Sequence, residues 1–305
     1  MLYKRLGNSE LQVSVIGYGC MSLQPGDPDA ERVIHHALDL GINFFDTADL
    51  YDKGLNEELI GRILRDRRGQ VVLATKAGNQ WRSDGSGWDW NPRKKYILKA
   101  VEDSLTRLQT DRIDLYQLHG GTLEDPLDET IEAFELLQQQ GKICYYGLSS
   151  IRPNVIREYV RRSGIVSVMM QYSLLDRRPE ESCLPLLQEK GIGVLARGGL
   201  AKGLLVDKPG APYLNYDAGQ VGQAAQAIRD EADSRCGVEE ERRRAAQTAI
   251  SFILANPAIT SAVTGIRTME QLEDLAGMGD PPPLGPVEME RLRKIIPVNY
   301  YDQHR

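Results

Sequence analysis

Apolar residues along the chain follow two alternating spacings. Short β-branched or aromatic runs are typical of buried strands, and each is followed by a stretch whose apolar residues recur every three or four positions, as on one face of a helix. The first helical stretch ends before Gly41 and places five apolar residues on one face: Ala30, Val33, Ile34, Ala37 and Leu38. The alternation continues almost to the end of the chain, so the sequence predicts a mixed α/β fold.

The pattern predicts eight strand–helix units. Their strands are expected at 13–16, 44–45, 71–74, 113–118, 143–146, 168–170, 192–196 and 261–263. Two helix starts carry a local signal: Asn91-Pro92 resembles an N-cap followed by a first helical residue, and Pro153 opens a later helix. A long helix is expected over about 239–254. No change in composition between units indicates a linker, so one domain is expected over 1–305.

Eight such units within about 260 residues fit a closed (β/α)8 barrel of the TIM type. The alternative is an open, doubly wound sheet, which would carry a G-x-G-x-x-G turn after its first strand. The turn here reads Gly17-Tyr18-Gly19-Cys20-Met21-Ser22 and lacks the third glycine. The barrel is therefore favoured.

Two segments fall outside the repeating units. Residues 2–13, with Gly7-Asn8 between two short runs, are expected to form a β-hairpin in front of the barrel. Residues 204–238 are rich in Gly, Pro, Asp and Gln and are expected to form a long loop after the seventh strand. Loops of that length are uncommon unless they serve function.

Charge and composition exclude several classes of protein. The 305 residues include 37 basic and 43 acidic side chains, a formal charge of −6, which gives no general attraction for nucleic acid or an anionic membrane. No apolar run approaches the roughly 18 to 20 residues of a membrane span. The N-terminus is charged where a signal peptide would be apolar. The four cysteines form no CxxC pair, so a reduced, cytoplasmic protein is expected.

Four polar side chains follow three neighbouring strands of the predicted barrel. Asp46 and Tyr51 follow the second strand, Lys76 ends the third, and His119 follows the fourth. Each has an ordinary interpretation alone: a turn cap, a surface aromatic, a solvated lysine or a structural histidine. The residues that follow the strands of such a barrel meet at one rim, however, and this rim carries the active site.

Together these four groups suit proton transfer. A free tyrosine has a pKa near 10 and is a weak acid at neutral pH, but an ammonium group stabilises its phenolate form. Asp46 can supply the counter-charge that a buried Lys76 needs. Tyr51 would then protonate an oxyanion forming on the substrate, with His119 polarising or orienting the same oxygen. No Cys–His, Ser–His–acid or zinc-type ligand cluster is comparably placed.

These residues lie in motifs that resemble those of the aldo-keto reductases, barrel enzymes that reduce carbonyl compounds with a nicotinamide cofactor. The motifs run in order along nearly the whole chain: Gly17-x-Gly19, Phe45-Asp46-Thr47-Ala48-x-x-Tyr51, Thr75-Lys76, Asp114-Leu115-Tyr116-x-Leu118-His119 and Gly147-Leu148-Ser149. The resemblance implies that Asp46, Tyr51, Lys76 and His119 form a catalytic tetrad acting on a small carbonyl or alcohol. We refer to these four residues as the tetrad.

Two other functions stay open on the same fold. The potassium-channel β subunits resemble the reductases and bind cofactor, so a regulatory role is the main alternative, although an intact tetrad favours catalysis. An aldolase or isomerase would need Lys76 to form a Schiff base, and a lysine paired with Asp46 stays protonated and is a poor nucleophile.

The resemblance also implies which residues hold the cofactor, NADP(H). They are Cys20, Met21, Asp46, Ser149, Ser150, Gln171, Arg197, Gly198, Leu200, Ala201, Lys202, Lys208, Gly265, Arg267, Gln271 and Asp274. Arg197 stands where relatives have an aromatic ring, so its planar guanidinium would stack on the nicotinamide. Arg267 would bind the 2′-phosphate, which favours NADPH over NADH, while Leu275 replaces a common asparagine near the adenine.

All three tryptophans lie in the segment 78–90. Trp81, Trp88 and Trp90 are expected either to form an apolar wall of the substrate pocket beside Met21 and Tyr51 or to fix a long loop to the barrel.

Overall fold

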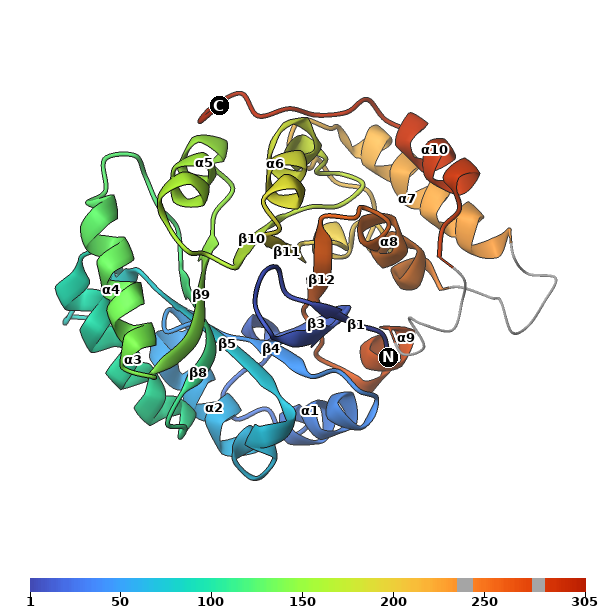
Figure 1. Cartoon of the computed structure of the whole chain (residues 1–305). Coiled ribbons are helices and arrows are strands. Elements are labelled where there is room, and N and C mark those ends of the chain that lie inside the picture. The colour runs from blue at the N-terminus through green and yellow to red at the C-terminus, as the bar shows by residue number, and fades with distance from the viewer. Residues whose placement is uncertain (235–243, 276–282) are drawn as a thin grey trace.

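The computed structural model describes residues 1–234, 244–275 and 283–305. Its centre is a closed barrel of eight parallel strands in which chain order and spatial order agree (Figure 1). The strands are β3 (Ile16–Gly19), β4 (Phe44–Asp46), β5 (Val72–Ala77), β8 (Ile113–Leu118), β9 (Ile143–Ser149), β10 (Ser167–Gln171), β11 (Gly193–Arg197) and β12 (Ile259–Thr264), and β12 pairs with β3 to close the ring. The predicted (β/α)8 barrel is confirmed.

Helices surround this barrel (Figure 1). In the described residues they are α1 (Ala30–Asp39), α2 (Leu55–Leu64), α3 (Lys94–Leu108), α4 (Leu127–Gln139), α5 (Pro153–Arg162), α6 (Cys183–Glu189), α7 (Ala218–Asp233), α8 (Ala245–Leu254), α9 (Met269–Leu275) and α10 (Pro286–Lys294). The apolar stripe predicted for the first of them is the buried face of α1. Of the helices that can be described, none is long and apolar enough to cross a membrane.

Two boundaries differ from the predictions, and a third prediction falls outside the described residues. The segment 204–238 is not a continuous loop, because α7 forms within it. Asp217 and Gln220 make a reciprocal capping box there, and the buried residues Val221, Ala224, Ala225 and Ile228 have helical spacing that the surrounding Gly and Gln residues obscured. Helix α3 begins at Lys94, three residues after Asn91. The start predicted near 239 lies outside the described residues, and α8 is described from Ala245.

The buried apolar residues form two layers. The larger lies between the strands and the surrounding helices. The smaller fills the barrel itself and consists of Leu6, Val13, Phe44, Ala74, Leu115, Val166, Met169, Leu195 and Val263. Side chains thus pack the interior below the strand ends, so the barrel is a filled core and a ligand can enter only at the rim.

The N-terminal hairpin supplies part of that interior packing. Strands β1 (Tyr3–Arg5) and β2 (Gln12–Ser14) pair antiparallel, as predicted, and the hairpin contributes Leu6, just after β1, and Val13 to the inner cluster. Gly7 lies in the turn with a φ of 54°, and a Cβ there would come within 2.2 Å of the Val166 carbonyl oxygen. The hairpin therefore closes the end of the barrel opposite the rim.

A close contact between α2 and α3 fixes the wall beside the predicted active site. Gly61 of α2 lies so near the end of α3 that a Cβ would meet backbone atoms of Arg107 and Leu108 at 2.5–2.6 Å. Backbone atoms cannot move aside as the end of a flexible side chain can. Only glycine fits at this crossing without separating the two helices.

Replacing Gly61→Ala should therefore destabilise the fold by about 1–3 kcal/mol, because the added methyl group overpacks the crossing. Urea denaturation of the purified variant measures this. Gly69→Ala is the matched control, since a Cβ at Gly69 meets nothing within 4 Å and the change should be neutral or slightly stabilising. Equal stabilities of the two variants would contradict the assignment.

Candidate active site

The tetrad comes together at the carboxyl ends of three adjacent strands. Asp46 ends β4, Lys76 lies one residue before the end of β5, and His119 follows β8. Tyr51 begins the short helix η2 (Tyr51–Gly54) just after β4. Its ring lies edge-on to the His119 imidazole, with 5.9 Å between centroids and 86° between planes. The acid, the phenol, the ammonium and the imidazole therefore lie together at the rim, as the sequence predicted.

Lys76 is the centre of this cluster. Its side chain is 1% exposed, and its Nζ donates to Asp46 Oδ2 at 2.6 Å, to the Thr47 carbonyl oxygen at 2.7 Å and to Tyr51 Oη at 3.4 Å. Burial alone would lower the pKa of Lys76, but Asp46 and Tyr51 outweigh it and hold that pKa above its ordinary value. The ammonium is thus charged and has all three of its N–H donors engaged.

His119 sits in the same pocket in its neutral form. Burial, with the positive charges of Lys76 and Arg197, lowers the pKa of His119 to about 3. Its Nδ1 has no hydrogen-bond partner among the described residues, while its carbonyl oxygen accepts from Asn79 Nδ2 at 3.0 Å. At neutral pH this side chain can donate or accept a hydrogen bond, but it carries no charge.

The tryptophan segment forms a second hairpin that secures the residues beside the tetrad. Strands β6 (Asn79–Trp81) and β7 (Trp88–Trp90) pair antiparallel. Trp81 donates from Nε1 to the Leu50 carbonyl, next to Tyr51, and Trp90 donates to Asp125 Oδ1. The Trp90 ring also covers Gly78 and Gly120, which adjoin β5 and His119. Trp81 and Trp90 therefore fix this segment to the barrel, which is one of the two roles expected for the tryptophans.

The residues predicted to bind the nicotinamide lie at the ends of the next three strands around the barrel, β9, β10 and β11. Ser149 and Ser150 are buried at the end of β9, and Ser150 Oγ already accepts from the Arg152 amide. Gln171 ends β10 and Arg197 ends β11, both half-buried. The positive charge of Arg197 favours a lower pKa for both Asp46 and His119, so Arg197 lies near the tetrad.

The glycine-rich turn after β11 has an unusual backbone. Gly198, Ala201 and Lys202 have φ values of 74°, 47° and 60°, the last two within η5 (Ala201–Gly203), and Leu200 lies between them, half-buried. Non-glycine residues rarely adopt this left-handed region, and such strain concentrates at functional sites. Lys202 and Lys208 are exposed, and the Lys208 side chain lies against Gly203.

The segment after β12 meets the first turn of the barrel. A Cβ on Gly265 would lie 3.3 Å from Ser22 of η1 (Cys20–Ser22), so these two segments are neighbours. Met21 is exposed there, whereas the Cys20 thiol is fully buried and can offer a ligand only its main chain.

The predicted adenosine-phosphate residues lie in and just before α9. Arg267 is exposed and its amide donates to Gln271 Oε1. The Asp274 carboxylate is paired with Arg244 at the start of α8.

Arg197, Lys202, Lys208 and Arg267 make no side-chain ion pair in the described structure. Their positive charges are of the kind that binds anionic groups such as phosphate.

Two residues that shape the site were not predicted, Gln117 and Asn56. Gln117 of β8 donates from Nε2 to Asp46 Oδ1 at 3.0 Å. Asn56 of α2 accepts from Thr47 Oγ1 and donates to the Cys20 and Leu23 carbonyls, which joins the first turn to the tetrad segment. A glutamine inside an apolar strand and an asparagine on a buried helix face were the available signals.

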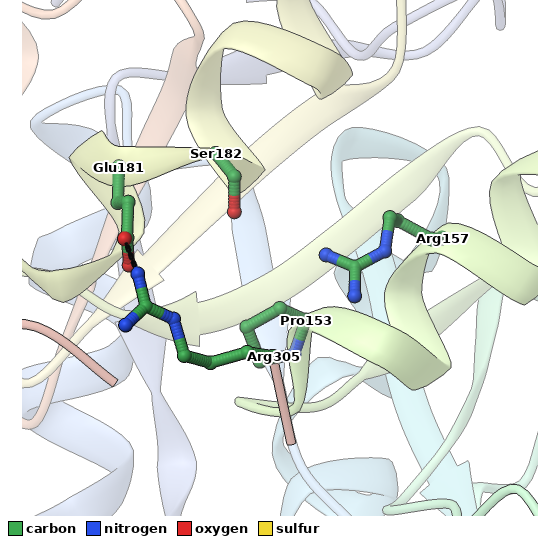
Figure 2. Close-up of a pocket in the computed structure, with 5 residues that line it drawn as sticks. All are labelled: Pro153, Arg157, Glu181, Ser182 and Arg305. Atoms are coloured by element: carbon green, nitrogen blue, oxygen red, sulfur yellow. Dashed lines mark hydrogen bonds and ion pairs between the residues drawn. The ribbon is translucent and has the colours of Figure 1, made fainter. Parts of the chain in front are cut away.

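A separate pocket lies between α5 and η4 (Arg178–Glu181) (Figure 2). Its lining residues are Pro153, Arg157, Glu181, Ser182 and Arg305, and Figure 2 shows the Arg305 side chain paired with Glu181. None of the five is a tetrad residue. This pocket therefore belongs to the anchoring of the C-terminal segment.

A sequence model of the Aldo/keto reductase family matches residues 15–297. The chain belongs to this family. Membership makes the protein an oxidoreductase and points to a nicotinamide cofactor. Among curated proteins, the uncharacterized oxidoreductase YqkF of Bacillus subtilis (strain 168) is 48% identical over 307 residues, covering 100% of both chains. The L-galactose dehydrogenase of Arabidopsis thaliana is 30% identical, covering 89% of this chain and 86% of its own.

Solved structures agree with this family membership. The holo form of the aldo-keto reductase AKR11C1 from Bacillus halodurans is 47% identical, superposes with a TM-score of 0.92 and covers 100% of this chain and 99% of its own. The glycerol dehydrogenase AKR11B4 from Gluconobacter oxydans is 26% identical, with a TM-score of 0.84 and coverages of 96% and 94%.

The low pKa of His119 should make stability depend on pH. Between the ordinary histidine pKa of about 6.5 and the folded value of about 3, the unfolded chain binds a proton that folded His119 does not. The free energy of unfolding should therefore fall as pH drops through this window. From pH 7.5 to 5.0, wild type should lose roughly 1–2 kcal/mol more than His119→Gln in urea denaturation. The exposed-residue control, His304→Gln, should lose as much as wild type; equal losses in all three would refute the assignment.

Proposed function

We propose that this protein reduces aldehydes or ketones to alcohols with NADPH, using Tyr51 as the general acid. The observation that carries the proposal is the hydrogen-bond pattern around Lys76. Because the ammonium donates to Tyr51 Oη, the phenol oxygen acts as an acceptor toward Lys76. The Tyr51 hydroxyl hydrogen is therefore not used by Lys76 and is available to a substrate oxygen.

Lys76 and Asp46 prepare Tyr51 for this transfer. A proton leaving Tyr51 creates negative charge on Oη, and the Lys76 ammonium lies 3.4 Å from that atom. Positive charge held in place before the reaction stabilises the developing anion in a site with little water. Asp46 keeps Lys76 charged within the barrel, so its role is electrostatic.

His119 is assigned a different role because it is neutral. With a pKa of about 3, His119 is not protonated to imidazolium at neutral pH and therefore has no acidic proton to transfer. A neutral imidazole can donate one hydrogen bond to the carbonyl oxygen and fix its position beside Tyr51 Oη. The proton itself would then come from Tyr51.

The cofactor would supply the hydride for the carbonyl carbon. Ser149, Ser150 and Gln171 would hold its carboxamide, and Arg197 would stack on its ring. Lys202 and the adjoining strained turn suit its phosphates, since exposed amides and ammonium groups bind phosphate oxygens well. Arg267 would hold the 2′-phosphate. That a 47% identical relative was solved in a holo form supports a bound cofactor in general.

Two other functions fit less well. A Schiff-base mechanism requires a neutral Lys76 amine, but this lysine has a raised pKa and three engaged donors. A regulatory subunit would need cofactor binding without turnover, and nothing in such a role would require the ordered contacts of Lys76 with Tyr51 and Asp46. The oxidoreductase relatives also favour catalysis.

Replacing Tyr51→Phe tests the general acid directly. It removes the transferable proton and keeps the ring, so the turnover number should fall by roughly two to four orders of magnitude. NADPH binding should change little, because the ring still fills its place. NADPH oxidation against a panel of aldehydes and ketones measures turnover, and Tyr300→Phe, an exposed tyrosine of the C-terminal segment, is the control. Near-normal turnover of Tyr51→Phe would remove Tyr51 from the mechanism; a wild type that binds NADPH but turns over no carbonyl would favour regulation.

Replacing Arg267→Ala tests the preference for NADPH. The loss of one charge-assisted contact costs about 1.5–3 kcal/mol, so NADPH affinity should fall roughly ten- to a hundred-fold. NADH has no 2′-phosphate, and its affinity should stay nearly unchanged. Fluorescence titration with both cofactors measures the effect, with Arg65→Ala on η3 (Arg65–Gln70) as an exposed control before β5. Equal weakening of both cofactors, or a wild type that prefers NADH, would overturn the assignment.

A further inference from the structure

Gln117 is a polar residue at an interior position of the barrel. It lies on β8, two residues after Leu115, which belongs to the cluster that fills the barrel, so both side chains point inward. In the strand register it is paired with Lys76 on one side and with Gly147 on the other. Its side chain is completely buried, with an exposed fraction of 0%.

The Gln117 amide holds the half of the Asp46 carboxylate that Lys76 leaves free. Nε2 donates to Asp46 Oδ1 at 3.0 Å, while Lys76 Nζ donates to Oδ2 at 2.6 Å. Each carboxylate oxygen thus has its own donor, which prevents rotation of the carboxylate plane. The amide orientation is unambiguous, because its carbonyl oxygen would be repelled by an ionised Asp46.

The rest of the amide has no structural use. Gln117 Oε1 is buried and has no hydrogen-bond partner among the described residues. A buried amide with an unpaired carbonyl costs free energy that a leucine or methionine would not. The contact with Asp46 is therefore the interaction that accounts for a glutamine at this position.

We propose that Gln117 is a positioning residue, which fixes the Asp46 carboxylate so that the Lys76 ammonium stays aimed at Tyr51. This inference rests on the proposed carbonyl reduction. Without the amide donor, Asp46 can turn about its Cβ–Cγ bond and draw Lys76 away from Tyr51 Oη. The loss would appear in the chemical step and not in substrate binding.

The environment of Asp46 also predicts a pH signature. Burial raises the pKa of Asp46, and the bonds from Lys76 and Gln117, with the charge of Arg197, oppose that rise. The other ionisable neighbours in the described residues are the Cys20 thiol and the Tyr51 phenol, both next to this ion pair, and the His119 imidazole, whose pKa of about 3 keeps it neutral across the acid limb above that pH. Removing the Gln117 donor should therefore raise the Asp46 pKa further and move the acid limb of the turnover profile to higher pH.

The test compares Gln117→Met with Leu115→Met, a matched change of an inward-facing residue on the same strand whose side chain cannot hydrogen-bond to Asp46. Gln117→Met should lower the turnover number about ten-fold, the effect of one charge-assisted hydrogen bond. Its KM should stay within about two-fold and its acid limb should move upward. Leu115→Met should keep the wild-type turnover and pH profile.

A third variant keeps the shape and changes the chemistry. In Gln117→Glu the new carboxyl can donate to Asp46 only while it is protonated, so turnover should be recovered at low pH and lost as pH rises. Crystal structures of wild type and Gln117→Met should show the Asp46 carboxylate rotated in the variant.

These measurements separate the two proposals. Wild-type turnover and acid limb in Gln117→Met, with Asp46 unmoved, would overturn the role of Gln117 and leave carbonyl reduction standing. A wild type without carbonyl turnover, together with a rotated Asp46 in the variant, would overturn the proposed function and support the positioning of Asp46 by Gln117.

Discussion

The buried ion pair between Lys76 and Asp46 is the constraint on which the site depends. Removing an ammonium and a carboxylate from water costs several kcal/mol per ion, and their attraction offsets this only when the remaining donors and acceptors are satisfied. Here the Thr47 carbonyl, Tyr51 Oη and the Gln117 amide complete the shell. The Tyr51 phenol and the Gln117 amide thus belong to the same set of contacts that keeps Lys76 charged.

The parallel barrel divides the rim into two halves. The tetrad comes from β4, β5 and β8, which are adjacent in the sheet, whereas the residues proposed for the cofactor, apart from Asp46, follow β9, β10, β11, β12 and β3. The two groups share one rim, whose centre is filled below by apolar side chains. A carbonyl held between them would meet a proton donor from one half and a hydride from the other, which is the arrangement that the proposed reaction needs.

The sequence was most informative where local pattern and topology coincide. Strand spacing predicted the barrel, and parallel strands bring their carboxyl ends together, so the meeting of Asp46, Lys76 and His119 could be predicted before any distance was known. Helix α7 was missed because a capping box and four apolar residues were read as part of a polar loop. The neutral state of His119 could not be predicted either, because it depends on burial and on charges brought from β5 and β11.

The sequence shows that Gln117 is a polar residue among apolar ones, but it does not show which residue Gln117 contacts. A glutamine in an otherwise apolar inward position is visible in the sequence, but its partner lies 71 residues away and depends on the order of the strands in the barrel. Contacts of this kind need the register of β5 against β8. A polar residue at an interior position therefore predicts that a partner exists, and the closed topology decides which one.

Strand β5 is held from outside by a second buried ion pair. Residues alternate along a strand, so Thr75 points away from the barrel where Lys76 points inward. Thr75 Oγ1 donates to Glu57 of α2 at 2.5 Å, and Glu57, with no exposed side-chain surface, is paired with Arg107 of α3 at 2.6 Å. The α2–α3 crossing at Gly61 brings these two helices close enough for that pair. Strand β5 is consequently held on both faces, through Lys76 by Asp46 within the barrel and through Thr75 by the helices outside it, so the packing of α2 against α3 helps fix the strand from which the Lys76 ammonium projects.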